Sequence, residues 1–259
     1  LFLHASGFIP QKEEAPVGVV YNMKICIWIT KIFDLGGTKR VVSLLANELV
    51  KEHEVTIMTY EDRFREDRTM YHLSEDINVD FIDNSQFVNK HHTPAFCARY
   101  LVKKLNDRSG MFNKKGLNPI LAEAIFPQKT REKWVEYFNS QDYDVILTTA
   151  SLSLRLAMIA PRLKAATIGW QHNCYDGYLH VKPVVFWQQE NLLQQYLPNL
   201  DRYIVLSDYD KRDYMEKLGI DCEVKINPRS FVSEKKCDVK SKRFLMATRF
   251  VYAKGLDLM

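Results

Sequence analysis

Residues 23–30 read Met-Lys-Ile-Cys-Ile-Trp-Ile-Thr. This β-branched and apolar run is typical of a strand that is buried on both faces of a sheet. The glycine pair Gly36-Gly37 follows it, and apolar residues then recur at helical spacing from Val41 to Leu49. The order of strand, glycine turn and helix predicts the first unit of a parallel α/β sheet.

The same alternation continues along most of the chain. Further strands are predicted at residues 54–60, 78–83, 143–149, 165–170, 202–206 and 222–227, and helices at residues 152–163, 184–197 and 209–218. Residues 84–141 are polar and helix-prone, and they are predicted to form a helical insertion. Because strands that alternate with helices favour right-handed crossovers, we expect an α/β fold with a Rossmann-like, doubly wound parallel sheet.

The two ends of the chain fall outside this pattern. Residues 1–22 lack periodicity and are predicted to be an N-terminal extension, which places the first domain at residues 23–220. Residues 221–242 are charged and are predicted to be a hinge and linker. Residues 243–259 begin with one more apolar strand, and one strand cannot bury a core. We expect this last segment to be the truncated start of a second Rossmann-like domain.

The composition excludes several classes of protein. The chain has 259 residues, 46% hydrophobic and 26% charged, which is typical of a globular domain and excludes a disordered or fibrous chain. A net charge of +4 is too small to indicate nucleic-acid binding without a local cluster. The five cysteines lack Cys-x-x-Cys spacing, which favours a reducing cytoplasm and argues against structural zinc. No apolar run reaches the ~18 residues of a membrane-spanning helix, so we expect a soluble, cytoplasmic protein.

A basic segment lies inside the predicted insertion. Residues 98–115 hold six lysine and arginine side chains and one aspartate, interleaved with apolar residues. Such a segment can lie on an anionic membrane surface or hold an anionic acceptor, and a solvated helix face is an equally good interpretation. On the first interpretation, the contacts with an acceptor or with the inner membrane face come from Arg99, Lys103, Lys104 and Arg108.

Two places at the expected carboxyl edge of the sheet are candidate ligand contacts. Gly36 and Gly37 precede a helix whose N-terminus favours an anion such as phosphate, although the motif by itself favours a plain tight turn. His172 follows the strand at 165–170, at the edge where open α/β sheets bind ligands. An imidazole there can bond sugar hydroxyls or exchange a proton near pH 7, and a locally satisfied loop histidine is the alternative. No metal site is predicted, because the pair at residues 91–92 lacks a third ligand.

The most specific stretch of sequence comes near the end of the chain. Residues 244–257 read Phe-Leu-Met-Ala-Thr-Arg-Phe-Val-Tyr-Ala-Lys-Gly-Leu-Asp. Arg249 ends a predicted strand and Lys254 precedes a helix start, so both cations are expected at one sheet edge. Two fixed cations suit a diphosphate.

This stretch resembles the signature that opens the C-terminal domain in glycosyltransferase family 4, a family of the GT-B fold. Three other places agree with the family in order: residues 23–41, Gln171-His172-Asn173, and residues 205–228. The resemblance covers about residues 23–259 and implies two Rossmann-like domains that face each other across a cleft. In such enzymes the acceptor binds mainly the N-terminal domain, and the donor nucleotide sugar binds mainly the C-terminal one.

The resemblance also implies roles for single residues. Gly36, Gly37, Arg249 and Lys254 would bind the donor diphosphate, without a metal ion or cofactor. His172 would be the catalytic residue that touches the transferred sugar or the incoming hydroxyl. The sequence departs from the family in three ways. Thr248 stands where glycine is usual, and the hinge motif is shortened. The family's two-glutamate motif, which holds the sugar and the ribose, is lacking.

The function implied is a retaining glycosyltransferase of the hexosyltransferase type. Its donor would be a nucleotide sugar, most often a UDP-sugar, and its acceptor a glycan or a lipid-linked molecule in surface polysaccharide biosynthesis. We expect the 259-residue chain by itself to be inactive and to bind nucleotide sugars weakly. The alternatives are a non-catalytic Rossmann-like module that binds a glycan, a membrane or a partner, and a nucleotide-dependent oxidoreductase, which lacks its glycine fingerprint here.

Overall fold

The computed structural model describes residues 22–83, 85, 87, 93–180, 185–229, 233–234, 238–242, 245–246 and 248. The chain divides into two units, Leu1–Pro228 and Arg229–Met259. In the second unit, the described residues form one 3₁₀ turn, Val239–Ser241, capped by the Asp238 side chain. The first unit carries the sheet.

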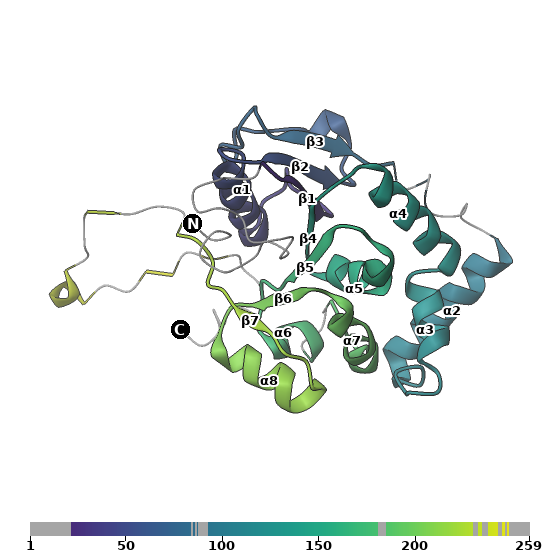
Figure 1. Ribbon diagram of the computed structural model, residues 1–259. Coiled ribbons are helices and arrows are strands. Elements are labelled where there is room, and N and C mark those ends of the chain that lie inside the picture. The colour runs from purple at the N-terminus through teal and green to yellow at the C-terminus, as the bar shows by residue number, and fades with distance from the viewer. Residues whose placement is uncertain are drawn as a thin grey trace, which may run out of the picture. The chain divides into compact units, whose positions relative to one another are not determined.

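Seven parallel strands form this sheet in the order β3-β2-β1-β4-β5-β6-β7 (Figure 1). They are β1 Lys24–Ile29, β2 Glu54–Thr59, β3 Asn78–Phe81, β4 Val145–Thr149, β5 Ala166–Trp170, β6 Arg202–Val205 and β7 Glu223–Val224. The strand order reverses between β1 and β4, which pair in register from Ile25 opposite Val145 to Trp28 opposite Thr148. The predicted doubly wound, Rossmann-like sheet is therefore confirmed, with its topological switch point between β1 and β4.

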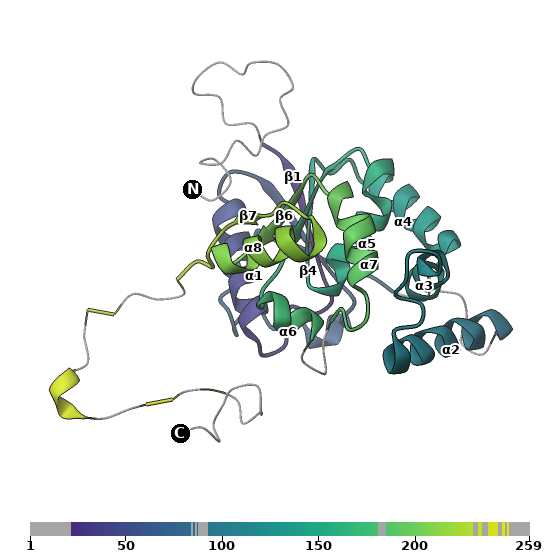
Figure 2. The ribbon, with the colours of Figure 1, turned by 90° about the horizontal axis from the view of Figure 1, so that it is seen from below.

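Eight helices connect and cover the strands in the described part of the chain. They are α1 Gly37–Leu49, α2 Pro94–Ser109, α3 Asn118–Ile125, α4 Gln128–Ser140, α5 Ser151–Ile159, α6 Tyr175–Leu179, α7 Glu190–Tyr196 and α8 Asp208–Leu218. The predicted insertion is helical, since α2, α3 and α4 occupy it, and α2 lies at the rim of the unit (Figure 2). No described helix has both the length and the apolarity needed to cross a lipid bilayer.

The helix predicted at residues 184–197 is shorter than expected. It begins only at Glu190, because Gln188 has a φ of +55°, which a right-handed helix cannot accommodate. The short helix α6 was not predicted, since five residues give no readable periodicity.

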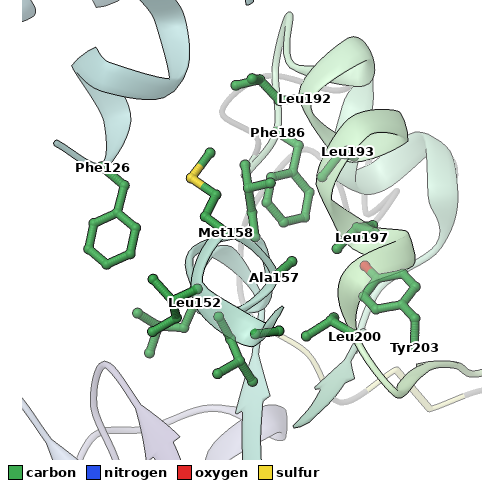
Figure 3. Close-up of a cluster of buried hydrophobic side chains, with 14 of the residues drawn as sticks. Phe126, Leu152, Ala157, Met158, Phe186, Leu192, Leu193, Leu197, Leu200 and Tyr203 are labelled. Carbon is green, nitrogen blue, oxygen red and sulfur yellow. The ribbon is translucent and has the colours of Figure 1, made fainter. Parts of the chain in front are cut away.

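The two faces of the sheet carry separate hydrophobic clusters. Ile25 and Ile27 of β1 pack with α1, whereas Cys26 and Trp28 point to the opposite face, toward α4 and α5. Figure 3 shows part of the cluster on the face of Cys26 and Trp28, in which Met158 of α5 faces side chains of the α7 region. Burial on both faces explains why β1 is continuously apolar.

An aromatic cluster anchors the helical insertion to the sheet. Trp134 of α4 stacks on Phe87 with ring centroids 3.9 Å apart, and its ring lies 4.6 Å from that of Trp28. Phe138 packs against both tryptophans. Trp28 also donates its indole N–H to the Tyr60 hydroxyl at 3.1 Å, so the cluster joins α4 to the ends of β1 and β2.

Candidate functional site at the carboxyl edge of the sheet

The loops that leave β1, β4 and β5 meet at one edge of the sheet. All the strands are parallel, so their carboxyl ends face the same way, and these three strands are neighbours in the sheet. The switch point between β1 and β4 lies in the middle of this edge. Open α/β sheets bind their ligands at such a point.

The loop and glycine turn after β1 are held by two side chains from the segment that follows β2. The buried Glu61 carboxylate accepts from the backbone N–H groups of Ile32 (2.5 Å) and Phe33 (2.9 Å). The Gly36 N–H donates to the Tyr71 hydroxyl at 2.8 Å. A Cβ at Gly37 would meet nothing within 4 Å, and α1 has no side-chain N-cap. Of the two predicted glycines, Gly37 therefore presents the more open amide, at the positive end of the α1 dipole.

The turn after β4 has a strained backbone. Ala150 adopts φ +52° and ψ −129° directly before α5. A residue with a Cβ is uncommon at positive φ, and such strain costs about 1–3 kcal/mol. Observed strain of this kind gathers at functional sites, and Ala150 lies beside the switch point, where nothing in the sequence pattern points to it.

His172, which follows β5, has the most unusual environment in the site. Its ring lies 4.4 Å from that of Trp170, and both of its ring nitrogens are buried without a hydrogen-bond partner among the described residues. The Nε1 of Trp170, whose ring contacts His172, and the Oδ1 of Asn227, whose side chain lies near His172, also lack partners among the described residues. Buried polar atoms are nearly always paired in native proteins, so this group of orphaned atoms indicates a place for a hydroxylated ligand.

Burial also sets the protonation state of His172. Loss of hydration lowers the pKa of its imidazole from 6.5 to about 4. The nearby Asn227 side chain opposes this shift, although no hydrogen bond of good geometry joins it to the ring. The imidazole is therefore neutral at pH 7, when it carries one N–H donor and one acceptor.

The residues next to His172 are structural. Gln171 is fully buried, donates to the Asn173 carbonyl at 2.7 Å and accepts from the Tyr203 hydroxyl at 3.1 Å. The His172 backbone N–H donates to the Tyr178 hydroxyl at 3.3 Å. These bonds hold the loop in place, and among the buried polar side-chain atoms of this triplet those of the His172 ring are the ones left without partners.

The predicted basic residues lie on α2 in two stripes. Thr93 caps this helix by accepting from the Phe96 N–H, and Gly110 ends it at a φ of +63°. Since residues four apart share a helix face, Arg99 and Lys103 form one stripe, and Lys104 and Arg108 form the other. The second stripe runs beside the exposed apolar side chains of Tyr100 (59% exposed), Leu101 (55%) and Leu105 (39%).

The other predicted positions have different outcomes. Arg249 and Lys254 lie outside the described residues, as does the histidine pair at 91–92, and the diphosphate role of the two cations stays a prediction. Within the described ranges, no three His, Cys, Asp or Glu side chains are grouped as a metal site. Sequence reasoning missed Trp170 and Asn227. Their only signals were that Trp170 ends a buried strand and that Asn227 belongs to the hinge motif.

Comparisons with known proteins give one family and several similar folds. The sequence model of Glycosyltransferase Family 4 matches residues 35–230. No curated protein matches the chain. Similar solved structures include the apo form of the lipopolysaccharide outer core galactosyltransferase WaaB, at 16% identity and a TM-score of 0.46, with 80% of this chain and 46% of that chain covered.

Two further structures show the same degree of likeness. Anabaena HepE in complex with UDP and glucose is 13% identical with a TM-score of 0.45, and the match covers 80% of this chain and 44% of that one. Sucrose-phosphate synthase from Thermosynechococcus elongatus is 13% identical with a TM-score of 0.48, covering 78% and 47%. The chain thus spans about half the length of the structures that it matches.

Proposed function

The chain belongs to glycosyltransferase family 4, and from that premise we propose that it forms the acceptor-binding part of a retaining hexosyltransferase. The donor is a nucleotide sugar, by family resemblance a UDP-sugar, and the acceptor is a glycan or a lipid-linked molecule of surface polysaccharide assembly. The observation that carries this proposal is the pair of buried, unpartnered ring nitrogens of His172 at the carboxyl edge of the sheet. The family match does not support the oxidoreductase alternative.

The proposed chemistry assigns His172 a positioning hydrogen bond. In transfer, the acceptor oxygen bonds to the anomeric carbon, the bond from that carbon to the diphosphate breaks, and the hydroxyl proton leaves with the departing phosphate or to water. A histidine whose pKa is about 4 is a weak base at pH 7, so its ring orients a hydroxyl and does not remove the proton. Gly37 offers its N–H to a donor phosphate, and Arg249 and Lys254 neutralise the leaving diphosphate.

The first experiment tests the role of His172 by measuring the rate of sugar transfer. With UDP-glucose, UDP-galactose or UDP-N-acetylglucosamine as donor and a membrane extract as acceptor, we expect His172→Ala to lower kcat/KM by about 10²-fold, because one hydrogen bond to the reacting groups is lost. The assay uses the chain together with any sequence that adjoins it in its gene, since we propose that the 259 residues alone do not turn over.

The control for this experiment is His180→Ala, which removes an exposed histidine that pairs with Asp176 on α6. Its kcat/KM should match that of the wild type. Equal rates for His172→Ala and wild type would contradict the assignment. Glycan binding without turnover of any donor would instead favour the non-catalytic binding module.

A second prediction concerns peripheral contact with a membrane. The stripe of Lys104 and Arg108 with its exposed apolar neighbours suits an anionic lipid surface, where each cation contributes about 1 kcal/mol. We expect the double variant Lys104→Gln/Arg108→Gln to bind phosphatidylglycerol vesicles roughly 30-fold more weakly in low salt, measured by sedimentation. The difference should shrink above ~0.15 M salt, where the screening length is about 8 Å.

The matched control removes two exposed lysines from another helix, as Lys129→Gln/Lys133→Gln on α4. It should retain vesicle binding. If both double variants lose affinity equally, overall charge and not this stripe drives binding, and the membrane proposal fails.

A further inference from the structure

A cavity of about 290 Å³ lies between α2, α3, α5 and the segment 185–189. Its polar lining includes Lys103 and Asp107 of α2, Ser151 and Arg155 of α5, and Trp187 and Gln189. Its size is at the lower end of small-molecule pockets. Because Ser151 follows β4 and the strained Ala150, the cavity adjoins the carboxyl edge of the sheet.

The cations of this cavity lack matching carboxylates. In the described part of the chain, Arg99, Lys103 and Arg155 make no ion pair within 4.0 Å, and Asp107 is the one acidic side chain in the lining. The guanidinium of Arg155 lies 5.8 Å from the centre of the Phe126 ring. Within the lining itself, two cations against one carboxylate leave a net charge of about +1, and Arg99 adds its positive charge from outside the lining. This excess of positive charge suits a phosphate group.

The nearby positive charges affect the pKa of the Lys103 ammonium. Although its side chain is exposed as a whole, its pKa is lowered, first by partial loss of hydration and then by repulsion from Arg155 and Arg99. Asp107 opposes the shift. Like charges that approach each other raise the energy of the empty site, and a bound anion would relieve that repulsion.

The walls of the cavity are tied together by hydrogen bonds. The buried Asn106 donates to the Gln188 carbonyl at 2.8 Å and accepts from the Phe112 N–H at 3.1 Å. Trp187 donates its indole N–H to the Asp107 carbonyl at 2.9 Å. These bonds fix α2 against the segment 185–189, so the position of Lys103 does not depend on a ligand.

We propose that this cavity, the Lys103–Arg155 pocket, binds a phosphate group carried by the acceptor. Lys103 and Arg155 reach it from two different helices, and Ser151 adds a hydroxyl donor. Lys104 and Arg108 form the outer stripe of α2 and take no part. The identification of the ligand as the acceptor rests on the proposed function. The binding of phosphate by this pocket does not depend on it.

The test is a titration of the 259-residue chain with inorganic phosphate at constant ionic strength, followed by NMR of the Trp187 indole. We expect saturable binding, weakened at least tenfold by Lys103→Gln and by Arg155→Gln. Lys104→Gln removes the same charge one residue along α2 and should leave binding unchanged. Since Arg155 also packs on Phe126, Arg155→Lys is included, and it should retain more affinity than Arg155→Gln.

Two further arms identify the source of the phosphate. If it belongs to a soluble acceptor, glucose 6-phosphate should compete with inorganic phosphate, and Lys103→Gln should still bind phosphatidylinositol vesicles like the wild type. If it belongs to a lipid headgroup, Lys103→Gln should lose binding to those vesicles at 0.5 M salt, where the outer stripe is screened. The proposal would be overturned if the NMR shifts of the Trp187 indole never saturate with phosphate. It would also be overturned if Lys104→Gln weakens phosphate binding as much as Lys103→Gln does. No donor is present, so this failure is distinct from a failure of sugar transfer.

Discussion

Replacing Trp134 with alanine should lower the free energy of unfolding by about 4 kcal/mol. The indole is almost fully buried, with 1% of it exposed, between Phe87, Trp28 and Phe138. Truncation removes its apolar burial and leaves a cavity that rigid neighbouring rings cannot fill. It also removes the contact by which α4 is anchored to the sheet. Urea unfolding followed by circular dichroism measures the change.

The control for Trp134 is Tyr100→Ala, which deletes an aromatic ring from the surface of α2. Because that ring is exposed, its loss should change the free energy of unfolding by less than about 0.5 kcal/mol. A loss below 1 kcal/mol in Trp134→Ala would mean that the insertion does not pack on β1 as described.

Acidification should destabilise the protein through His172. The pKa of this imidazole is about 4 in the folded chain against an ordinary value of 6.5, so between these values the unfolded chain binds a proton that the folded chain does not. Stability therefore falls as the pH drops from 6.5 to 4, by roughly 3 kcal/mol in total from this group. Above pH 6.5 the group contributes no pH dependence, and below pH 4 its loss is complete.

The measurement compares urea unfolding of wild type and His172→Gln across pH 4–7, because carboxyl groups titrate in both and cancel in the difference. We expect the pH dependence of stability to be flatter in His172→Gln than in the wild type. The imidazole resonance of His172 should have its midpoint near pH 4 by NMR. A midpoint above pH 6 would contradict the burial on which the site assignment depends.

Local patterns in the sequence were enough to predict the architecture. The apolar run of β1, the glycine turn before α1 and the regular alternation after residue 143 predicted a doubly wound parallel sheet, which the structure confirms. The polar, helix-prone sequence of residues 84–141 predicted a helical insertion, and α2, α3 and α4 lie there. These predictions succeed because strand and helix periodicity depend on neighbours within a few residues.

The site was predicted only in part. His172 could be placed at the carboxyl edge, because parallel strands all end there. The burial of its two ring nitrogens without partners could not be predicted, since that depends on Trp170 and on a hinge residue far along the chain, Asn227. In the same way, Arg155 was not singled out, because its nearness to Lys103 depends on how α2 and α5 are placed around the cavity.

The sequence by itself determined the alternation of strands and helices, the family and the edge of the sheet at which the candidate site lies. Only the tertiary structure decided which polar atoms lose their water without gaining a partner, and which cations converge. Periodicity records which face of an element is apolar, and it holds no information on distances between elements. Hydration and charge interactions, which set the pKa of His172 and the character of the Lys103–Arg155 pocket, depend on those distances.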